Sequence, residues 1–377
     1  MDKSRRNFLK KTGLAASGVL IGSASNVVKS EEDKKEEIMA IKKIRPLGFQ
    51  WETQDPFLFC VHHEDLYPEG NDNQGPNASL QGRQLGQDFI IKDGWRMYHG
   101  KNVPGFPGHP HRGFETITVV RDGYVDHADS LGGAARYGHG DVQWMTAGKG
   151  LQHSEMFPLL HPDKGNRMEL FQIWLNLPKK SKMVNPYFKM NWSEDMPIIE
   201  QKDKNNKKIQ IEVLAGKFGD KSAPSANPDS WAADDSNHVA IYAFKFEAGA
   251  EFVIPKTEKG VNRSLYFFEG KSLTIEDQPL ASYHAADVDE RVDLHIINGE
   301  TDGQILLLQG KPLNEPVVQH GPFVMNTREE VQQAFLDYQK TGFGGWPWSS
   351  HDPVHGSEIK RFAKHPDGKE EVREESN

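Results

Sequence analysis

The sequence has almost no cysteine: Cys60 is the single cysteine among 377 residues. One thiol excludes an internal disulfide and a zinc site built from cysteine pairs. The body of the chain also lacks a basic stripe. The chain carries 45 Lys and Arg against 54 Asp and Glu, a formal net charge of −9. This balance excludes the electrostatic footprint of a nucleic-acid-binding protein.

A long apolar run is missing too. The weakly apolar run at residues 12–24 falls short of the roughly 20 residues that span a membrane, so no stable membrane anchor is expected. It follows Ser4-Arg5-Arg6-Asn7-Phe8-Leu9-Lys10, a twin-arginine pattern that resembles the signals read by the Tat export machinery. That machinery carries folded proteins, often with a cofactor in place. Residues 1–39 are therefore expected to be a Tat signal peptide and linker, and the protein is expected to be exported to the bacterial periplasm.

Helical periodicity is absent between the apolar stretches of the first half. Short alternating stretches separated by glycine turns stand there instead, at residues 57–61, 114–120, 124–127 and 170–177. A second series begins near Ile209 and continues at residues 239–246, 251–254, 264–269, 273–275, 294–298 and 305–308. Such alternation is typical of antiparallel barrels and sandwiches. The sequence predicts an all-β fold of two antiparallel barrels related by duplication.

One helix is predicted, over residues 327–341. Thr327 and Glu330 have the spacing of a capping box, and Gly342 has the position of a helix C-cap. From residue 346 onward Pro, Gly and charged residues dominate, which predicts a tail that is disordered from Lys369.

Two short segments concentrate the chemistry. His109 and His111 are spaced i, i+2, and so are His153 and Glu155. On a strand such spacing places both side chains on the same face of the sheet. If the two segments are neighbours inside a barrel, three imidazoles and a carboxylate converge, and this is a set of metal ligands.

The strings around these residues are long and specific. They are Phe106-Pro107-Gly108-His109-Pro110-His111-Arg112-Gly113-Phe114-Glu115-Thr116, Gly140-Asp141-Val142-Gln143-Trp144-Met145-Thr146-Ala147-Gly148 and Glu315-Pro316-Val317-Val318-Gln319-His320-Gly321-Pro322-Phe323-Val324-Met325-Asn326-Thr327. They resemble the signature of the pirin family, a branch of the cupins, over residues 40 to 345. The resemblance implies a bicupin of two jelly-roll barrels. It places an N-terminal metal-binding domain at 40–200, a C-terminal cupin domain without metal ligands at 201–345 and a tail at 346–377.

The alternation of side chains along a strand does not decide which carboxylate is the metal ligand. The general cupin pattern takes it from a Glu four residues after the second histidine, here Glu115. The pirin resemblance implies Glu155, together with His109, His111 and His153. Glu115 is then expected to orient a histidine or to act as a base near the substrate, and Glu155 is a second candidate for that base.

Other features near the site are expected to be structural. His62 and His63 are expected in a loop or at the surface, and His127 as a structural residue on the strand after Gly123. Residues 67–85 read as a loop that could cover the mouth of the site.

Three nitrogens and one oxygen suit iron(II), and would also accept manganese, cobalt, nickel, copper or zinc. Because bacterial pirin-like proteins resemble quercetin 2,3-dioxygenases, the resemblance implies a dioxygenase that acts on a small aromatic, flavonol-like substrate with dioxygen. The alternative is a non-enzymatic, redox-sensitive regulatory protein that binds a partner. A third possibility is a metal that only holds the fold together.

Overall fold

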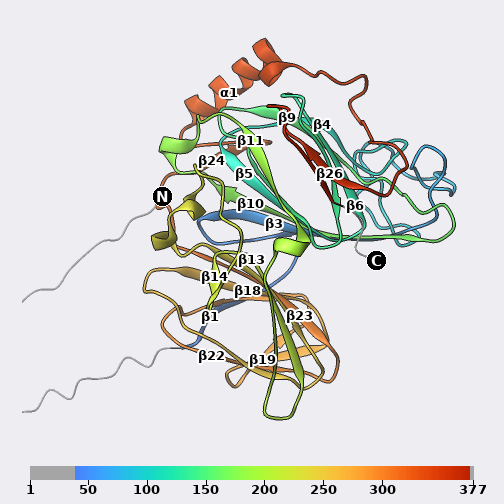
Figure 1. The fold of residues 1–377 in the computed structure, drawn as a ribbon. Helices are drawn as coiled ribbons and strands as arrows, with labels where there is room; N and C mark the ends of the chain where they lie inside the picture. The colour runs from blue at the N-terminus through green and yellow to red at the C-terminus, as the bar shows by residue number, and fades with distance from the viewer. Residues whose placement is uncertain (1–38, 374–377) are drawn as a thin grey trace, which may run out of the picture. The chain divides into compact units, whose positions relative to one another are not determined.

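The computed structural model describes residues 39–373. The predicted signal and nearly all of its linker (1–39) lie outside these residues, as does the end of the tail at 374–377. Figure 1 shows strands throughout the described chain and one α-helix, α1 (Arg328–Thr341). The predicted mostly-β composition is therefore confirmed. Within residues 39–373, no helix has both the length and the apolar character needed to cross a membrane.

Two six-stranded antiparallel sheets make up the half of the molecule that carries the histidine motifs. The first has the order β11 (Tyr187–Asn191), β8 (Val142–Thr146), β5 (Phe114–Asp122), β10 (Asn166–Asn176), β3 (Phe57–Tyr67) and β2 (Gln50–Trp51). The second has the order β27 (Glu370–Arg373), β26 (Arg361–Lys364), β7 (Ala134–Gly138), β6 (Tyr124–Asp129), β9 (Leu151–Met156) and β4 (Gly105–His111).

The other half contains a seven-stranded and a four-stranded sheet. The larger has the order β1 (Ile41–Pro46), β21 (His284–Val288), β18 (Asn262–Glu269), β23 (Gly303–Gly310), β16 (Ala240–Phe246), β13 (Lys208–Ala215) and β12 (Ile198–Lys202). The smaller has the order β17 (Glu251–Ile254), β22 (Leu294–Asn298), β19 (Ser272–Ile275) and β20 (Gln278–Ala281). These sheets are open, so two closed barrels are not confirmed.

The remaining elements are short. Two hairpins pair β14 (Lys217–Phe218) with β15 (Lys221–Ser222) and β24 (Val318–His320) with β25 (Phe323–Met325). Five 3-10 turns occur in the described chain, η1 (Lys179–Ser181), η2 (Ser193–Asp195), η3 (Trp231–Ala233), η4 (Asp235–Asn237) and η5 (Gly342–Gly344).

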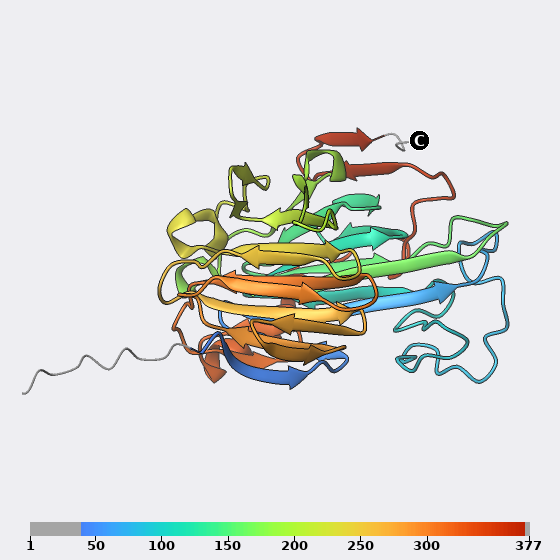
Figure 2. The same ribbon diagram turned by 90° about the horizontal axis from the view of Figure 1, so that it is seen from below.

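The ends of the described chain join sheets far from them in sequence. Figure 2 shows the blue strand β1 beside the orange strands of the second half, where it pairs with β21. The red strands β26 and β27 extend the sheet of the first half through β7. The predicted disorder from Lys369 is therefore wrong for Glu370–Arg373, because β27 pairs with β26.

A shared core joins the two halves. Ile117 and Ile173 of β5 and β10 belong to the same buried cluster as Ile241 and Leu306 of β16 and β23. The side chains of β5 therefore divide between two environments, because successive residues of a strand point to opposite faces. One face of β5 meets the second half, and the other faces β9 and the histidines.

Helix α1 forms as the sequence predicts. Thr327 caps it through a capping box with Glu330, and Gly342 ends it in a left-handed conformation. Val331 and Ala334 are buried, and Ala334 packs in a cluster with Phe323 and Phe343.

Candidate metal centre and its cavity

Three histidines meet where β4 and β9 pair. His109 lies directly opposite His153 in the antiparallel register. The ring centroids lie 4.7 Å apart for His109 and His111, 4.5 Å for His109 and His153, and 4.9 Å for His111 and His153. One nitrogen from each ring lies within 4.8 Å of the others. The i, i+2 spacing and the strand register together produce this cluster.

The free ring nitrogens and the protonation of these imidazoles suit the binding of a metal ion. Neither ring nitrogen of His153 has a hydrogen-bond partner, although the side chain is fully buried. His109 donates from Nδ1 to the carbonyl oxygen of Pro107 at 2.9 Å, which leaves the Nε2 lone pair available. Burial lowers the pKa of His109 to about 4 and lowers the pKa of His111 and His153 well below the usual value. Neutral imidazole is the form that binds metals.

Glu155 lies beside this trio on β9. Its Oε2 is 3.8 Å from Nε2 of His153, and it is not among the three residues whose donor atoms converge within 4.8 Å. Thr118 donates to Oε1 at 3.1 Å and Gln172 donates to Oε2 at 3.2 Å. Each carboxylate oxygen keeps a second lone pair that can serve a metal. Burial raises the pKa of Glu155.

Glu115 points away from the histidines. It pairs with Thr146 across β5 and β8 and accepts a hydrogen bond from the Thr146 hydroxyl at 2.7 Å. Asn227, from the second half of the chain, donates to the same hydroxyl at 2.9 Å. Glu115 shares its face of β5 with Ile117 of the shared core, whereas Thr118, on the opposite face, reaches Glu155. The structure therefore does not bring Glu115 to the histidines or to the cavity beside them.

This placement gives Glu115 a pH-dependent effect on stability. Burial raises its pKa from 4.5 to about 7. Between these values the folded chain holds a proton that the unfolded chain has lost, so the free energy of unfolding falls as pH rises through that window. Glu115→Gln keeps an acceptor for Thr146 and is expected to raise the free energy of unfolding by about 3 kcal/mol at pH 8, and hardly at all at pH 4.5. Urea unfolding of both proteins at the two pH values measures this. A gain independent of pH would contradict it.

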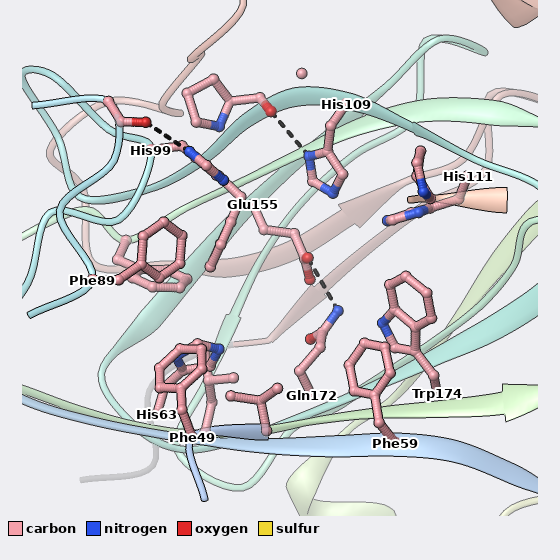
Figure 3. Close-up of a pocket in the computed structure, with 18 of the residues that line it drawn as sticks. Phe49, Phe59, His63, Phe89, His99, His109, His111, Glu155, Gln172 and Trp174 are labelled. Carbon is pink, nitrogen blue, oxygen red and sulfur yellow. Dashed lines mark hydrogen bonds between the residues drawn. The ribbon is translucent and has the colours of Figure 1, made fainter. Parts of the chain in front are cut away.

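A cavity of about 680 Å³ opens beside the histidines. This volume is within the roughly 300–1,000 Å³ of typical small-molecule sites. Figure 3 shows Glu155 and Gln172 near its middle, with His109 and His111 on one side. Aromatic rings supply much of the remaining wall, from Phe49, Phe59, Phe89, Phe106, Phe157 and Trp174.

The segment between β3 and β4 contributes to the cavity. Gly86, Phe89, His99 and Lys101 line it, whereas residues 67–85 do not. The chain between β3 and β4 therefore does reach the cavity, but through residues 86–101 and not through the predicted residues 67–85.

Three further histidines for which the sequence makes a prediction are His62, His63 and His127. His63 is on strand β3, is 4% exposed and lines the cavity, so its prediction as a loop or surface residue was wrong. The same prediction was wrong for His62, which is also on β3, has a side chain that is 4% exposed and has its Nε2 3.2 Å from Glu169. His127 has its ring centroid 5.5 Å from that of His153, and its Nε2 lies 3.2 Å from Asp129.

Comparisons with known proteins agree with the motifs. Residues 71–175 match the family Pirin, and residues 241–344 match the Pirin C-terminal cupin domain. A Pseudomonas aeruginosa protein, provisionally named a quercetin 2,3-dioxygenase, is 39% identical over 241 residues, which cover 63% of this chain and 79% of that protein. Human pirin is 34% identical over 68% of this chain and 83% of its own length. The solved structure of quercetin 2,3-dioxygenase from Acinetobacter baumannii is similar with a TM-score of 0.64 and 25% identity, over 81% of this chain and 98% of that one.

Proposed function

The chain belongs to the pirin family, with its bicupin fold, and we propose that it is a metal-dependent dioxygenase acting on a flavonol-like substrate. The observation that carries this proposal is the position of the histidine cluster on the wall of an aromatic-lined cavity. His109, His111 and Glu155 all line it. A metal that only held the fold together would need no such cavity. The names of two similar proteins, one from Pseudomonas aeruginosa and one from Acinetobacter baumannii, also support this chemistry.

We propose iron(II) as the resident ion, held by His109, His111, His153 and Glu155. Manganese, cobalt, nickel, copper and zinc are accepted by the same donor set. When bound, such an ion supplies Lewis-acid and redox chemistry to a hydroxylated aromatic substrate and dioxygen. The unpartnered nitrogens of His153 support this ligand set, because burying two polar atoms without partners is costly unless something else satisfies them.

The protein's own residues prepare the substrate. The rings of Phe59 and Trp174, 4.2 Å apart between centroids, form an apolar wall that holds a flat molecule and excludes water. Glu155 then accepts the proton of the substrate hydroxyl that faces the histidines. Thr118 and Gln172 hold the carboxylate in place through the hydrogen bonds described above.

Oxygen uptake tests the proposal. Protein purified without oxygen and loaded with iron(II) is expected to consume dioxygen when flavonols are added, and to release ring-opened products. His153→Ala protein, treated identically, provides the blank. If loaded protein takes up no oxygen with any flavonol of a broad panel, the dioxygenase proposal fails, and the predicted redox-sensitive regulatory protein becomes the leading alternative.

We also propose that the protein is exported by the Tat pathway to the periplasm. Replacing both Arg5 and Arg6 by Lys is expected to trap it in the cytoplasm, because Tat recognition depends on the arginine pair. Immunoblots of periplasmic and cytoplasmic fractions measure the distribution. A variant with Lys10→Arg and Lys11→Arg, outside the pair, should be exported normally. Normal export of the Arg5→Lys, Arg6→Lys variant would refute the signal.

A further inference from the structure

A buried imidazole, that of His63, lines the cavity away from the histidine cluster. Figure 3 places His63 beside Phe49 on one side of the cavity and His111 with Trp174 on the other, with Glu155 and Gln172 between them. The ring of His63 packs 5.9 Å from Phe49 and 5.7 Å from Phe106, measured between centroids. The buried imidazole of His63 therefore lies at an aromatic end of the cavity, where the exposed imidazole of His99 also packs against Phe89 and Phe106.

A chain of hydrogen bonds fixes the protons of this imidazole. Arg96 donates to both carboxylate oxygens of Asp65, at 2.9 Å and 3.1 Å. The Tyr98 hydroxyl donates to the same carboxylate at 2.6 Å. A phenol has one proton, so its oxygen can only accept from Nδ1 of His63, which lies 2.8 Å away. Nδ1 therefore carries the proton.

The other nitrogen of His63 is consequently an acceptor. A neutral imidazole protonated at Nδ1 has a lone pair at Nε2. Burial and the nearby Arg96 lower the pKa of His63 to about 3, so the ring is neutral at physiological pH. Among the described residues Nε2 has no hydrogen-bond partner, and unlike the nitrogens of His153 it is not sealed from the cavity.

We propose that Nε2 of His63 accepts a hydrogen bond from a substrate hydroxyl remote from the one that faces the metal-binding histidines. The cavity thereby selects flat polyphenols that carry a hydrogen-bond donor at each end. This inference rests on the proposed function only in taking the cavity as the substrate site. His63 is a specificity-determining residue, and Tyr98 and Asp65 act through it as positioning residues.

The size of the preference for a substrate with the remote hydroxyl follows from the cost of leaving Nε2 of His63 without a hydrogen bond. A substrate without the remote hydroxyl buries the Nε2 lone pair against an apolar ring. Leaving one buried polar group unpaired corresponds to about 10- to 100-fold in binding or in kcat/KM. The rings of Phe49 and Phe106 and the hydrogen bond to Tyr98 keep Nε2 of His63 in one orientation. The preference is therefore expected for a hydroxyl at one position of the substrate.

A series of substrates that differ by one hydroxyl tests the proposal on the unaltered protein. The series is 3-hydroxyflavone, 3,4′-dihydroxyflavone and 3,7-dihydroxyflavone, assayed with iron-loaded protein. Oxygen uptake gives kcat/KM, and anaerobic titration of flavonol fluorescence gives Kd. One dihydroxyflavone is expected to exceed 3-hydroxyflavone by about 10- to 100-fold in both measurements. Equal values for all three compounds would overturn the inference and leave the dioxygenase proposal intact.

Two variants attribute the preference to the chain of hydrogen bonds. His63→Phe keeps an aromatic ring but removes both nitrogens, and is expected to reduce the ratio between dihydroxyflavone and 3-hydroxyflavone to about one. Tyr98→Phe removes the acceptor that fixes the proton on Nδ1 of His63, so it is expected to reduce the same ratio partly, by about 10-fold or less. A merely structural role would lower the values for all flavonols together. An unchanged ratio in His63→Phe would overturn the assignment. If no flavonol is oxidised but the preference in Kd persists and depends on His63, the inference stands and the dioxygenase proposal falls.

Discussion

Replacing Glu155 by Ala is expected to weaken metal binding by more than the roughly 10- to 100-fold loss of affinity typical of residues that only support a ligand, so that the metal retained after dialysis falls from about one ion per chain to less than about a tenth. Glu155 is the only acidic residue among the described residues that line the cavity. Without it, a buried divalent ion would face three neutral imidazoles, and an unneutralised buried charge is very costly. Metal analysis after dialysis, together with titration of the apo-protein with iron(II), measures the effect.

The control for this variant is the other buried carboxylate. Glu115→Gln should bind metal like the parent, because Glu115 contacts Thr146 on the opposite face of β5. The pair separates the two cupin assignments that the sequence left open. If Glu115→Gln lost its metal while Glu155→Ala kept it, the ligand set proposed above would be wrong.

The second large effect is on stability. Replacing Arg136 by Met is expected to lower the free energy of unfolding by about 3–5 kcal/mol. Arg136 and Asp126 are 1% and 0% exposed and are joined by two hydrogen bonds of 2.7 Å. Removing the guanidinium leaves a buried carboxylate without its counter-charge. Arg136 also donates to the carbonyl oxygens of Gly356 and Glu358, so the segment leading to β26 loses its anchor as well.

An exposed pair on the neighbouring strands provides the control. Lys364 and Glu370 are 55% and 62% exposed and lie 3.5 Å apart, and breaking such a pair typically costs less than about 1 kcal/mol. Denaturant unfolding of the parent, Arg136→Met and Lys364→Met compares the two sites. Equal losses in the two variants would show that the buried pair does not stabilise the C-terminal strands as described.

The histidine cluster could be predicted because its signal is local. Two i, i+2 pairs on adjacent strands need only the alternation of a strand and one register, in which His109 faces His153. The helix was equally accessible, since Thr327, Glu330 and Gly342 specify its ends through short-range capping. Local rules of this kind do not depend on the rest of the fold.

Glu115 could not be placed by the same counting. Between His111 and Glu115 the chain leaves one sheet and enters the other through Gly113, which has a φ of +88° and a Cβ position only 2.0 Å from the carbonyl oxygen of Val324. This turn breaks the alternation of side chains, so counting every second residue from His111 does not predict which face of β5 carries Glu115. Only the three-dimensional path shows that Glu115 faces the second half.

His63 and the C-terminal strands were missed for a different reason. His62-His63-Glu64-Asp65 is a run of polar residues, yet β3 continues through it, because its pairing with β10 extends to Tyr67. The partners that satisfy His63 and Asp65 are Tyr98 and Arg96, more than thirty residues away. The charged strand β27 likewise depends on β26 and β7. Long-range pairing of polar residues leaves no periodic signal in the sequence.

Anomalous diffraction tests the central claim most directly. Crystals of the protein, grown without oxygen and loaded with iron(II), should be measured on both sides of the iron absorption edge. We predict one strong peak within about 2.0–2.3 Å of a ring nitrogen from each of His109, His111 and His153 and of a carboxylate oxygen of Glu155. The peak should adjoin the aromatic cavity. A fully loaded protein whose iron lies elsewhere, or whose iron is bound by Glu115 instead of Glu155, would contradict the account.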